Sequence, residues 1–117
     1  MHVRWERRRW SGQEGAGYSL VARLVEPRWV DGRVRDRYLG HLGAMMERSL
    51  AYPPAREVFR ARIAARLVGL VGDADTRRRL MQSVDRRVPE PTEQERADAR
   101  VVFPRRLDDV PIRMPRL

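Results

Sequence analysis

The clearest pattern of apolar and polar positions predicts a β-hairpin in the N-terminal half of the chain. Residues 18–30 and 33–39 alternate apolar or aromatic side chains with charged ones, which is typical of β-strands. Asp31 and Gly32 separate the two runs, and an Asp-Gly pair in that position favours a two-residue type I′ turn. Residues 2–10 also have strand character, so we expect them to form an edge strand of the same sheet.

The strand periodicity changes to a helical one after Gly40. Apolar residues then recur every three or four positions and predict a short helix that ends near Tyr52, before two prolines. These residues are Leu42, Met45, Met46 and Leu50. A longer helix is predicted over residues 55–71, with Pro54 at its start and Gly72 closing its end. The apolar stripe of this longer helix consists of Phe59, Ile63, Leu67, Leu70 and Val71.

Two further helices are expected in the C-terminal half. One begins at Asp73 or Asp75 and directs three apolar side chains inward. These side chains are Leu80, Met81 and Val84. Thr92 and Glu95 have the spacing of a capping box, which predicts a short helix that ends near Val102.

The sequence therefore predicts an α+β protein with one small domain over residues 1–103. Within it, residues 1–43 form a small antiparallel sheet of two or three strands, with a glycine-bearing loop over residues 11–17. Residues 44–103 supply three or four helices. Residues 104–117 are interrupted by proline and lack a helical period, so we expect an extended tail that becomes ordered on a partner.

Composition adds a strong basic character to this picture. The 117 residues include 25 basic against 16 acidic ones, for a formal net charge of +9, and every basic residue is arginine. A basic surface attracts polyanions such as nucleic acids, or acidic faces of other proteins. Arginine without lysine follows from the codon bias of a GC-rich genome, but its planar guanidinium also suits phosphates and guanine edges.

The sequence offers no pattern of catalytic or metal-binding residues. Cysteine is absent, and His2 and His41 are too far apart to have metal-ligand spacing. No serine stands in a nucleophile elbow, and Asp108 and Asp109 lie in the tail, where nothing fixes their geometry. We therefore expect a non-enzymatic protein without metal or cofactor. With no apolar run of about 20 residues and no signal peptide, we expect a cytoplasmic protein without membrane contact.

The two-residue turn fixes which residues of the hairpin lie opposite each other. The expected pairs are Val30–Arg33, Trp29–Val34, Arg28–Arg35, Pro27–Asp36, Glu26–Arg37, Val25–Tyr38 and Leu24–Leu39. Alternation gathers apolar side chains on one face, which we expect to pack on the helices: Val25, Trp29, Val34 and Tyr38. The opposite face is expected to point outward and carries Glu26 with four arginines, namely Arg28, Arg33, Arg35 and Arg37.

The arginine face is the main chemical clue. Glu26 can neutralise Arg37, but Arg28 lies directly opposite Arg35, and like charges at cross-strand distance are unfavourable. An anion between the two guanidinium groups would remove this penalty. Because a two-stranded ribbon fits the major groove of duplex DNA, the four arginines are candidate nucleic-acid contacts. The alternative is that they are solvated residues of an exposed strand.

Within residues 18–43, a strand that ends in Val25 and Glu26 is followed by the Asp-Gly turn, a basic strand and a closing Leu-Gly. This succession resembles the N-terminal segment of some DDE-type insertion-sequence transposases. No catalytic domain follows, so the resemblance implies a DNA-binding module of a mobile genetic element or phage, without transposase activity. The order of three strands and a helix is also similar to that of small β-sheet DNA readers such as integrase arm-type domains.

A second cluster of candidate nucleic-acid contacts consists of Arg7, Arg8 and Arg9, which lie between Trp5 and Trp10. Cations beside stacking rings are typical of single-strand contacts. In a strand the two rings point to opposite faces, so we expect one of them to belong to the core.

Arg77 and Arg78 form a third candidate cluster in the first turns of a helix. They either contact phosphate or pair locally with Asp73 and Asp75. Three other arginines lie away from the apolar stripe of the longer helix and are expected to keep it soluble: Arg56, Arg60 and Arg66.

Our first hypothesis is a nucleic-acid-binding protein that contacts DNA, in preference to RNA, through the arginine-rich hairpin. The alternative is a small protein-binding adaptor or inhibitor that docks on a nucleoprotein complex such as a CRISPR effector, as the interleaved acids and the Arg/Pro tail suggest. A third hypothesis is a subunit of an oligomer, because several apolar residues are surplus to the expected core: Met45, Met46, Trp29 and Tyr52.

Overall fold

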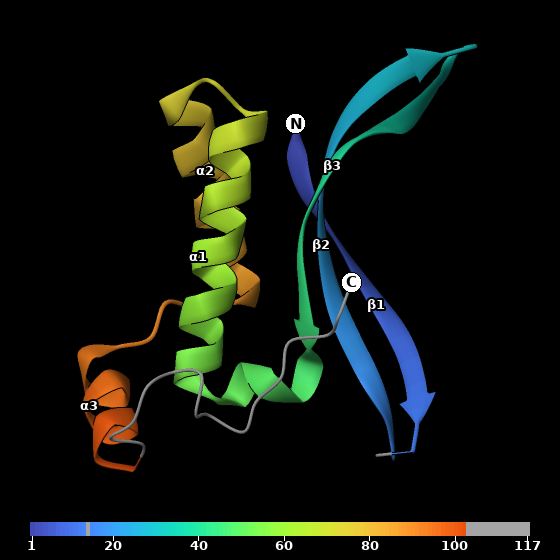
Figure 1. The fold of residues 1–117 in the computed structure, drawn as a ribbon. Helices are drawn as coiled ribbons and strands as arrows, with labels where there is room; N and C mark the ends of the chain where they lie inside the picture. Colours follow the sequence, from blue (N-terminus) through green and yellow to red (C-terminus); the bar gives the residue numbers. More distant parts are fainter. Residues whose placement is uncertain (14, 103–117) are drawn as a thin grey trace.

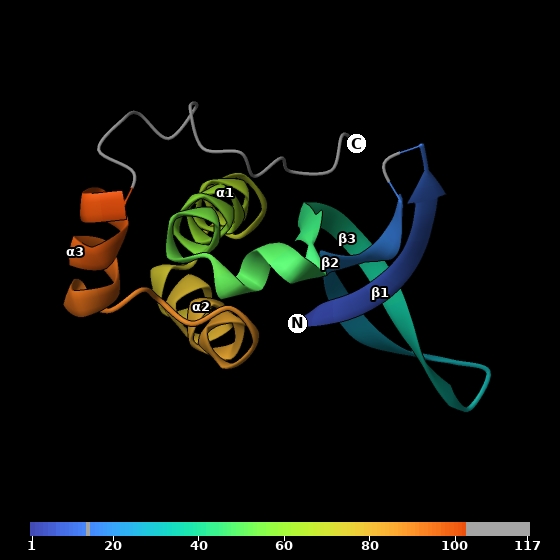
Figure 2. The same ribbon diagram turned by 90° about the horizontal axis from the view of Figure 1, so that it is seen from below.

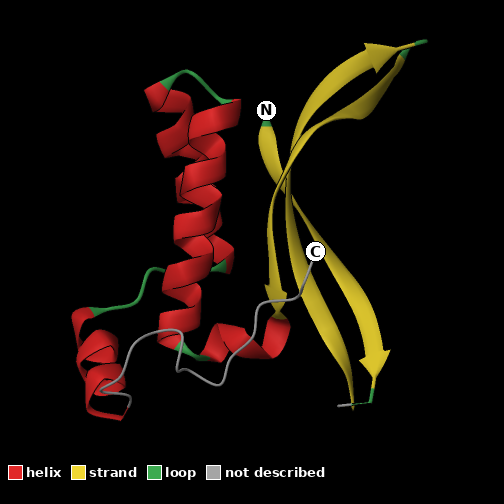
Figure 3. Cartoon of the chain, viewed as in Figure 1, coloured by secondary structure: helices red, strands yellow, loops and turns green. Residues whose placement is uncertain are grey.

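A computed structural model describes residues 1–13 and 15–102 and confirms the α+β architecture. A three-stranded antiparallel sheet in the order β1-β2-β3 is followed by the helices (Figures 1 and 3). The elements are β1 (His2–Gly12), β2 (Gly15–Val30), β3 (Arg33–Met46), the 3-10 helix η1 (Glu47–Ala51), α1 (Pro53–Leu70), α2 (Ala74–Arg87) and α3 (Glu93–Val102). The tail predicted over residues 104–117 lies outside the described residues.

The edge strand predicted over residues 2–10 is confirmed and is longer than expected. It pairs with β2 from His2 opposite Val25 to Gly12 opposite Gly15. The predicted loop over residues 11–17 is therefore wrong at both ends, because only two residues connect the strands. Gly15 has a φ of 119°, a conformation that glycine adopts without strain, and this allows the chain to turn so tightly.

The hairpin between β2 and β3 follows the predicted register near its turn. Asp31 and Gly32 have φ values of 49° and 76°, as a type I′ turn requires. The expected pairs from Val30–Arg33 to Val25–Tyr38 are all present. The predicted Leu24–Leu39 pair is wrong, since Leu24 lies opposite Gly40.

The short helix predicted to end near Tyr52 is also wrong over its first half, because β3 continues to Met46 and only η1 follows it. Two register shifts in β3 explain the misleading period: Leu39 and Leu42 are extra residues that have no partner of their own in β2. Such bulges shift the strand alternation by one residue. Leu42 and Met45 are therefore both buried although they are three positions apart, a spacing that resembles a helix.

The longer helix and its apolar stripe are confirmed by α1. Phe59, Ile63 and Leu67 are fully buried and pack in one core with alternate residues of β2. These β2 residues are Leu20, Ala22 and Leu24. Figure 2 shows that the helices all lie on the same side of the sheet. Leu70, predicted to be in the stripe, is partly exposed, and Gly72 lies outside the left-handed region, so it does not close the helix as expected.

The remaining helices begin where their caps predict. The Asp73 carboxylate accepts a hydrogen bond from the Thr76 backbone N–H at 3.0 Å, and Leu80 and Val84 of α2 are buried in the core. The Glu95 backbone N–H donates to the Thr92 hydroxyl at 3.1 Å, and the Thr92 N–H donates to the Glu95 carboxylate at 3.2 Å, which confirms the capping box. None of the described helices has the length and apolar character needed to cross a membrane.

Candidate nucleic-acid interface

The hairpin ends in an arm that projects beyond the rest of the molecule, which we call the ribbon (residues 26–37). Because β1 begins opposite Val25, only β2 and β3 continue past this point. In Figure 1 the ribbon extends past the helices, and every residue from Pro27 to Tyr38 is exposed. The ribbon therefore presents both of its faces to a partner.

One face of the ribbon carries the four arginines predicted from the register. Arg28 lies opposite Arg35, and Arg33 and Arg37 follow on the same face of β3. Within residues 1–13 and 15–102, none of the four side chains forms an ion pair or a hydrogen bond. The expected neutralisation of Arg37 by Glu26 is therefore wrong, and the four guanidinium groups stay available to a ligand.

The other face of the hairpin is apolar, and our prediction that it packs on the helices is wrong, because three of its four residues are exposed and the fourth, Val25, is buried outside the core that contains the helices. Trp29 is 77% exposed, Val34 57% and Tyr38 58%; only Val25 at the base is buried. The helices cover the β2 face that Leu24 belongs to, and strand alternation places Val25 and Trp29 on the opposite face. The arginine face therefore lies on the same side of the sheet as the core. It is exposed because the ribbon continues beyond the helices.

Two of the three arginines in the predicted cluster on β1 already bind other side chains of the protein. The Arg7 guanidinium donates to the Glu47 carboxylate at 2.6 and 3.0 Å and lies over the Tyr18 ring at 3.6 Å from its centroid. The Arg8 side chain donates to Glu6 at 3.2 Å. These contacts lower the pKa of both carboxyl groups and raise the pKa of Arg7. Only Arg9 of this cluster is exposed and without a side-chain partner among the described residues.

The β1 cluster does not meet the ribbon. Arg8 lies opposite Ser19, and Ser19 and Arg28 are nine positions apart in β2. At the rise of an antiparallel strand this separation is about 30 Å. One of the two tryptophans of this segment belongs to the core, as predicted. Trp5 packs against the core, with its ring centroid 6.3 Å from that of Phe59.

The cluster at the start of α2 favours the local alternative. Arg78 forms an ion pair with Asp75 at 2.7 Å, while Arg77 donates to the Val71 carbonyl at 2.7 Å and so caps the end of α1. The Asp73 carboxylate accepts hydrogen bonds from the hydroxyl and the backbone N–H of Thr76, which lower the pKa of that carboxyl. Arg77 and Arg78 are therefore already occupied within the fold.

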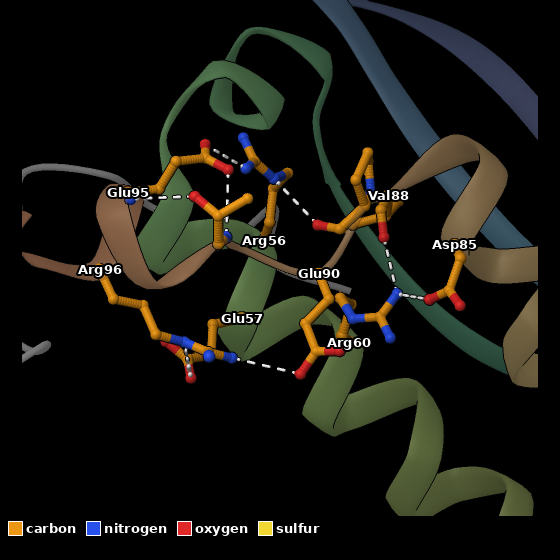
Figure 4. A network of polar contacts seen from close by, with 10 residues as sticks. Arg56, Glu57, Arg60, Asp85, Val88, Glu90, Glu95 and Arg96 are labelled. Atoms are coloured by element: carbon orange, nitrogen blue, oxygen red, sulfur yellow. Dashed lines mark hydrogen bonds and ion pairs between the residues drawn. The ribbon is translucent and has the colours of Figure 1, made fainter.

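A polar network around α1 was missed by the sequence reasoning, which assigned Arg56 and Arg60 to solubility. Arg56 is buried at 8% exposure and donates to the Leu50 carbonyl, the Pro89 carbonyl and the Glu95 carboxylate at 2.8, 3.1 and 2.6 Å (Figure 4). Arg60 donates to the Val88 carbonyl at 2.8 Å and pairs with Asp85. The signal was present, because Arg56 precedes Phe59 by three residues and so lies on the apolar stripe.

His41 is partly buried in β3. Burial is the main cause of its lowered pKa, and the nearby Arg66, Arg23 and Arg8 lower the pKa further. The imidazole therefore takes up a proton less readily than a histidine in water does.

Comparisons of the chain with models of protein families, with curated proteins and with solved structures found no match.

Proposed function

We propose that this protein is a non-enzymatic DNA-binding protein whose ribbon enters the major groove with its arginine face toward the bases. The observation that carries the proposal is the placement of four arginines without partners among the described residues on one face of a projecting two-stranded arm. A major groove about 12 Å wide admits such a ribbon, and arginine binds the O6 and N7 atoms of guanine through two hydrogen bonds.

The Arg28–Arg35 pair gives the ribbon a reason to bind an anion. Two guanidinium groups directly opposite each other repel, and no acid of the described residues lies between them to offset this repulsion. A phosphate or a guanine edge between the two side chains would convert the repulsion into two charge-assisted contacts. Binding of an anion would thereby relieve the repulsion expected between these two cross-strand neighbours.

Most other arginines that sequence reasoning singled out have internal partners. Arg7, Arg8, Arg77 and Arg78 all contact groups of the fold itself. Duplex DNA is favoured over duplex RNA because the major groove of A-form RNA is too deep and narrow for a ribbon. The resemblance of the hairpin to insertion-sequence transposases also supports DNA, and it suggests a mobile genetic element or phage as the source of the protein.

A fluorescence anisotropy titration of a labelled DNA duplex at low salt tests this proposal. The Arg28→Ala/Arg35→Ala variant is expected to bind about tenfold or more weakly, because each arginine that contacts a base contributes about 1–3 kcal/mol. The matched control is Arg62→Ala/Arg79→Ala, which removes two exposed arginines from α1 and α2 and the same total charge. Absence of wild-type binding, or an equal loss in both variants, would contradict the proposal.

A further inference from the structure

The apolar strip of the ribbon lies outside the hydrophobic core of the described residues, and it contains their most exposed large apolar side chain. Trp29 lies directly opposite Val34, and Tyr38 extends the same face toward the base. An exposed apolar strip of this kind marks a surface that another molecule covers. A groove of DNA occupied by the arginine face leaves this strip uncovered, because the two faces point in opposite directions.

Charge distinguishes the two faces of the ribbon. On the apolar face, Asp36 forms an ion pair with Arg4 at 3.6 Å. Arg23 lies 6.0 Å from the centroid of the Tyr38 ring and pairs with Glu6 at 3.1 Å. The charged groups next to the apolar strip are therefore matched within the chain. The arginine face, in contrast, would repel another copy of itself.

We infer that a second copy of this chain covers the apolar face, so that two ribbons stack with Trp29, Val34 and Tyr38 between them. The face is suited to this role because its charges are already paired, and because the helices lie on the other side of the sheet. Two sheets pack face to face about 10 Å apart, and one apolar patch that meets its own copy gives a closed two-fold dimer.

The dimer has a consequence that rests on the proposed function. With the apolar faces together, the arginine faces of the two ribbons point away from each other. Each would then occupy the groove of a different duplex, so the dimer would bridge two DNA segments.

Sedimentation equilibrium of the full chain, over a range of concentrations and without nucleic acid, tests the inference. The wild-type mass is expected to rise from 13.7 kDa toward twice that value, and Trp29→Ser/Val34→Ser is expected to remain monomeric. Arg28→Ser/Arg35→Ser is the matched control, because it alters the opposite face of the same ribbon and is expected to associate as the wild type does. Circular dichroism checks that each variant is folded.

Three results would overturn the inference. The first is a wild-type chain that stays monomeric at every concentration, and the second is an equal loss of association in both variants. The third is association that occurs only when DNA is added, which would assign the apolar face to nucleic acid. Because dimerisation is measured without DNA, a failure of the DNA-binding proposal would not be mistaken for a failure of this one.

Discussion

The same residue type has opposite roles in this protein, and the surroundings of each side chain decide which role it has. Arg56 is buried, and two backbone carbonyls and a carboxylate accept its hydrogen bonds. Arg28 is exposed and has no side-chain partner among the described residues. We therefore expect removal of Arg56 to lower the free energy of unfolding, and removal of Arg28 to leave it nearly unchanged.

The Arg56–Glu95 contact predicts a pH dependence of stability. The hydrogen bond from Arg56 is the largest cause of the lowered pKa of Glu95 in the folded protein. Its stabilising contribution is therefore present above the ordinary value of 4.5 and is lost as the pH falls through the lowered folded pKa. We expect Glu95→Gln to be less stable than the wild type at neutral pH, and the difference to shrink in acid.

Urea denaturation at a series of pH values measures this difference. Glu93→Gln is the matched control, because Glu93 is exposed on the same helical turn and forms no ion pair with a described residue. A difference between Glu95→Gln and the wild type that stays constant from neutral to acid pH would show that the carboxylate charge has no stabilising role.

Two glycines of β3 predict opposite responses to a methyl group. A Cβ atom at Gly43 would lie 3.3 Å from Cε2 of Phe59, whose ring is fully buried and cannot move aside. A Cβ atom at Gly40 would lie only 2.6 Å from Cδ1 of Leu70, but this side chain is flexible and partly exposed. We expect Gly43→Ala to destabilise by about 1–3 kcal/mol and Gly40→Ala to be nearly neutral, as measured by urea denaturation. The reverse order would contradict the packing described for Phe59.

At the scale of elements, the features with local signals could be predicted from the sequence. The Asp31-Gly32 turn, Pro54 at the start of α1 and the Thr92–Glu95 capping box each depend on neighbouring residues only. The Arg28–Arg35 pairing was predictable for the same reason, since the turn alone fixes the register there. The length of β3 could not be predicted from the sequence, because two bulges gave its buried residues a helical spacing.

The side of the sheet that the helices cover also could not be predicted. Residues of both parities in β2 are apolar and buried, so alternation does not indicate which parity faces α1. Leu20 and Leu24 belong to one face, and Val21 and Val25 to the other. The ion pair of Arg7 with Glu47 could not be predicted either, because Glu47 lies 40 residues away in the sequence.

The ribbon is expected to unfold locally more easily than the rest of the sheet, because it lacks a buried face. Gly32→Ala places a Cβ atom on a residue with a φ of 76°, which costs about 1–2 kcal/mol. We expect faster amide hydrogen exchange in residues 26–37 and unchanged exchange in the β2 segment that packs on α1. Gly12→Ala, at a glycine with open space and no left-handed φ, is the control. Faster exchange throughout the sheet would mean that the ribbon and the core unfold together.

At the scale of the whole molecule, the hydrophobic core and the proposed binding surface lie in different parts. The helices and the base of the sheet share the hydrophobic core, and the ribbon contributes no residue to it. Substitutions on either face of the ribbon should therefore leave the fold intact. This separation allows the arginine face and the apolar face to be tested independently of each other.

The salt dependence of DNA binding tests the central claim most directly. For the wild type, the logarithm of the binding constant should fall linearly with the logarithm of salt concentration. Each phosphate contact contributes about 0.9 to the slope. Arg28→Ala/Arg35→Ala should bind more weakly, with a shallower slope wherever these side chains contact phosphate, while Arg62→Ala/Arg79→Ala should keep the wild-type affinity and slope. Identical affinities and slopes for all three proteins would contradict the assignment of DNA binding to the ribbon.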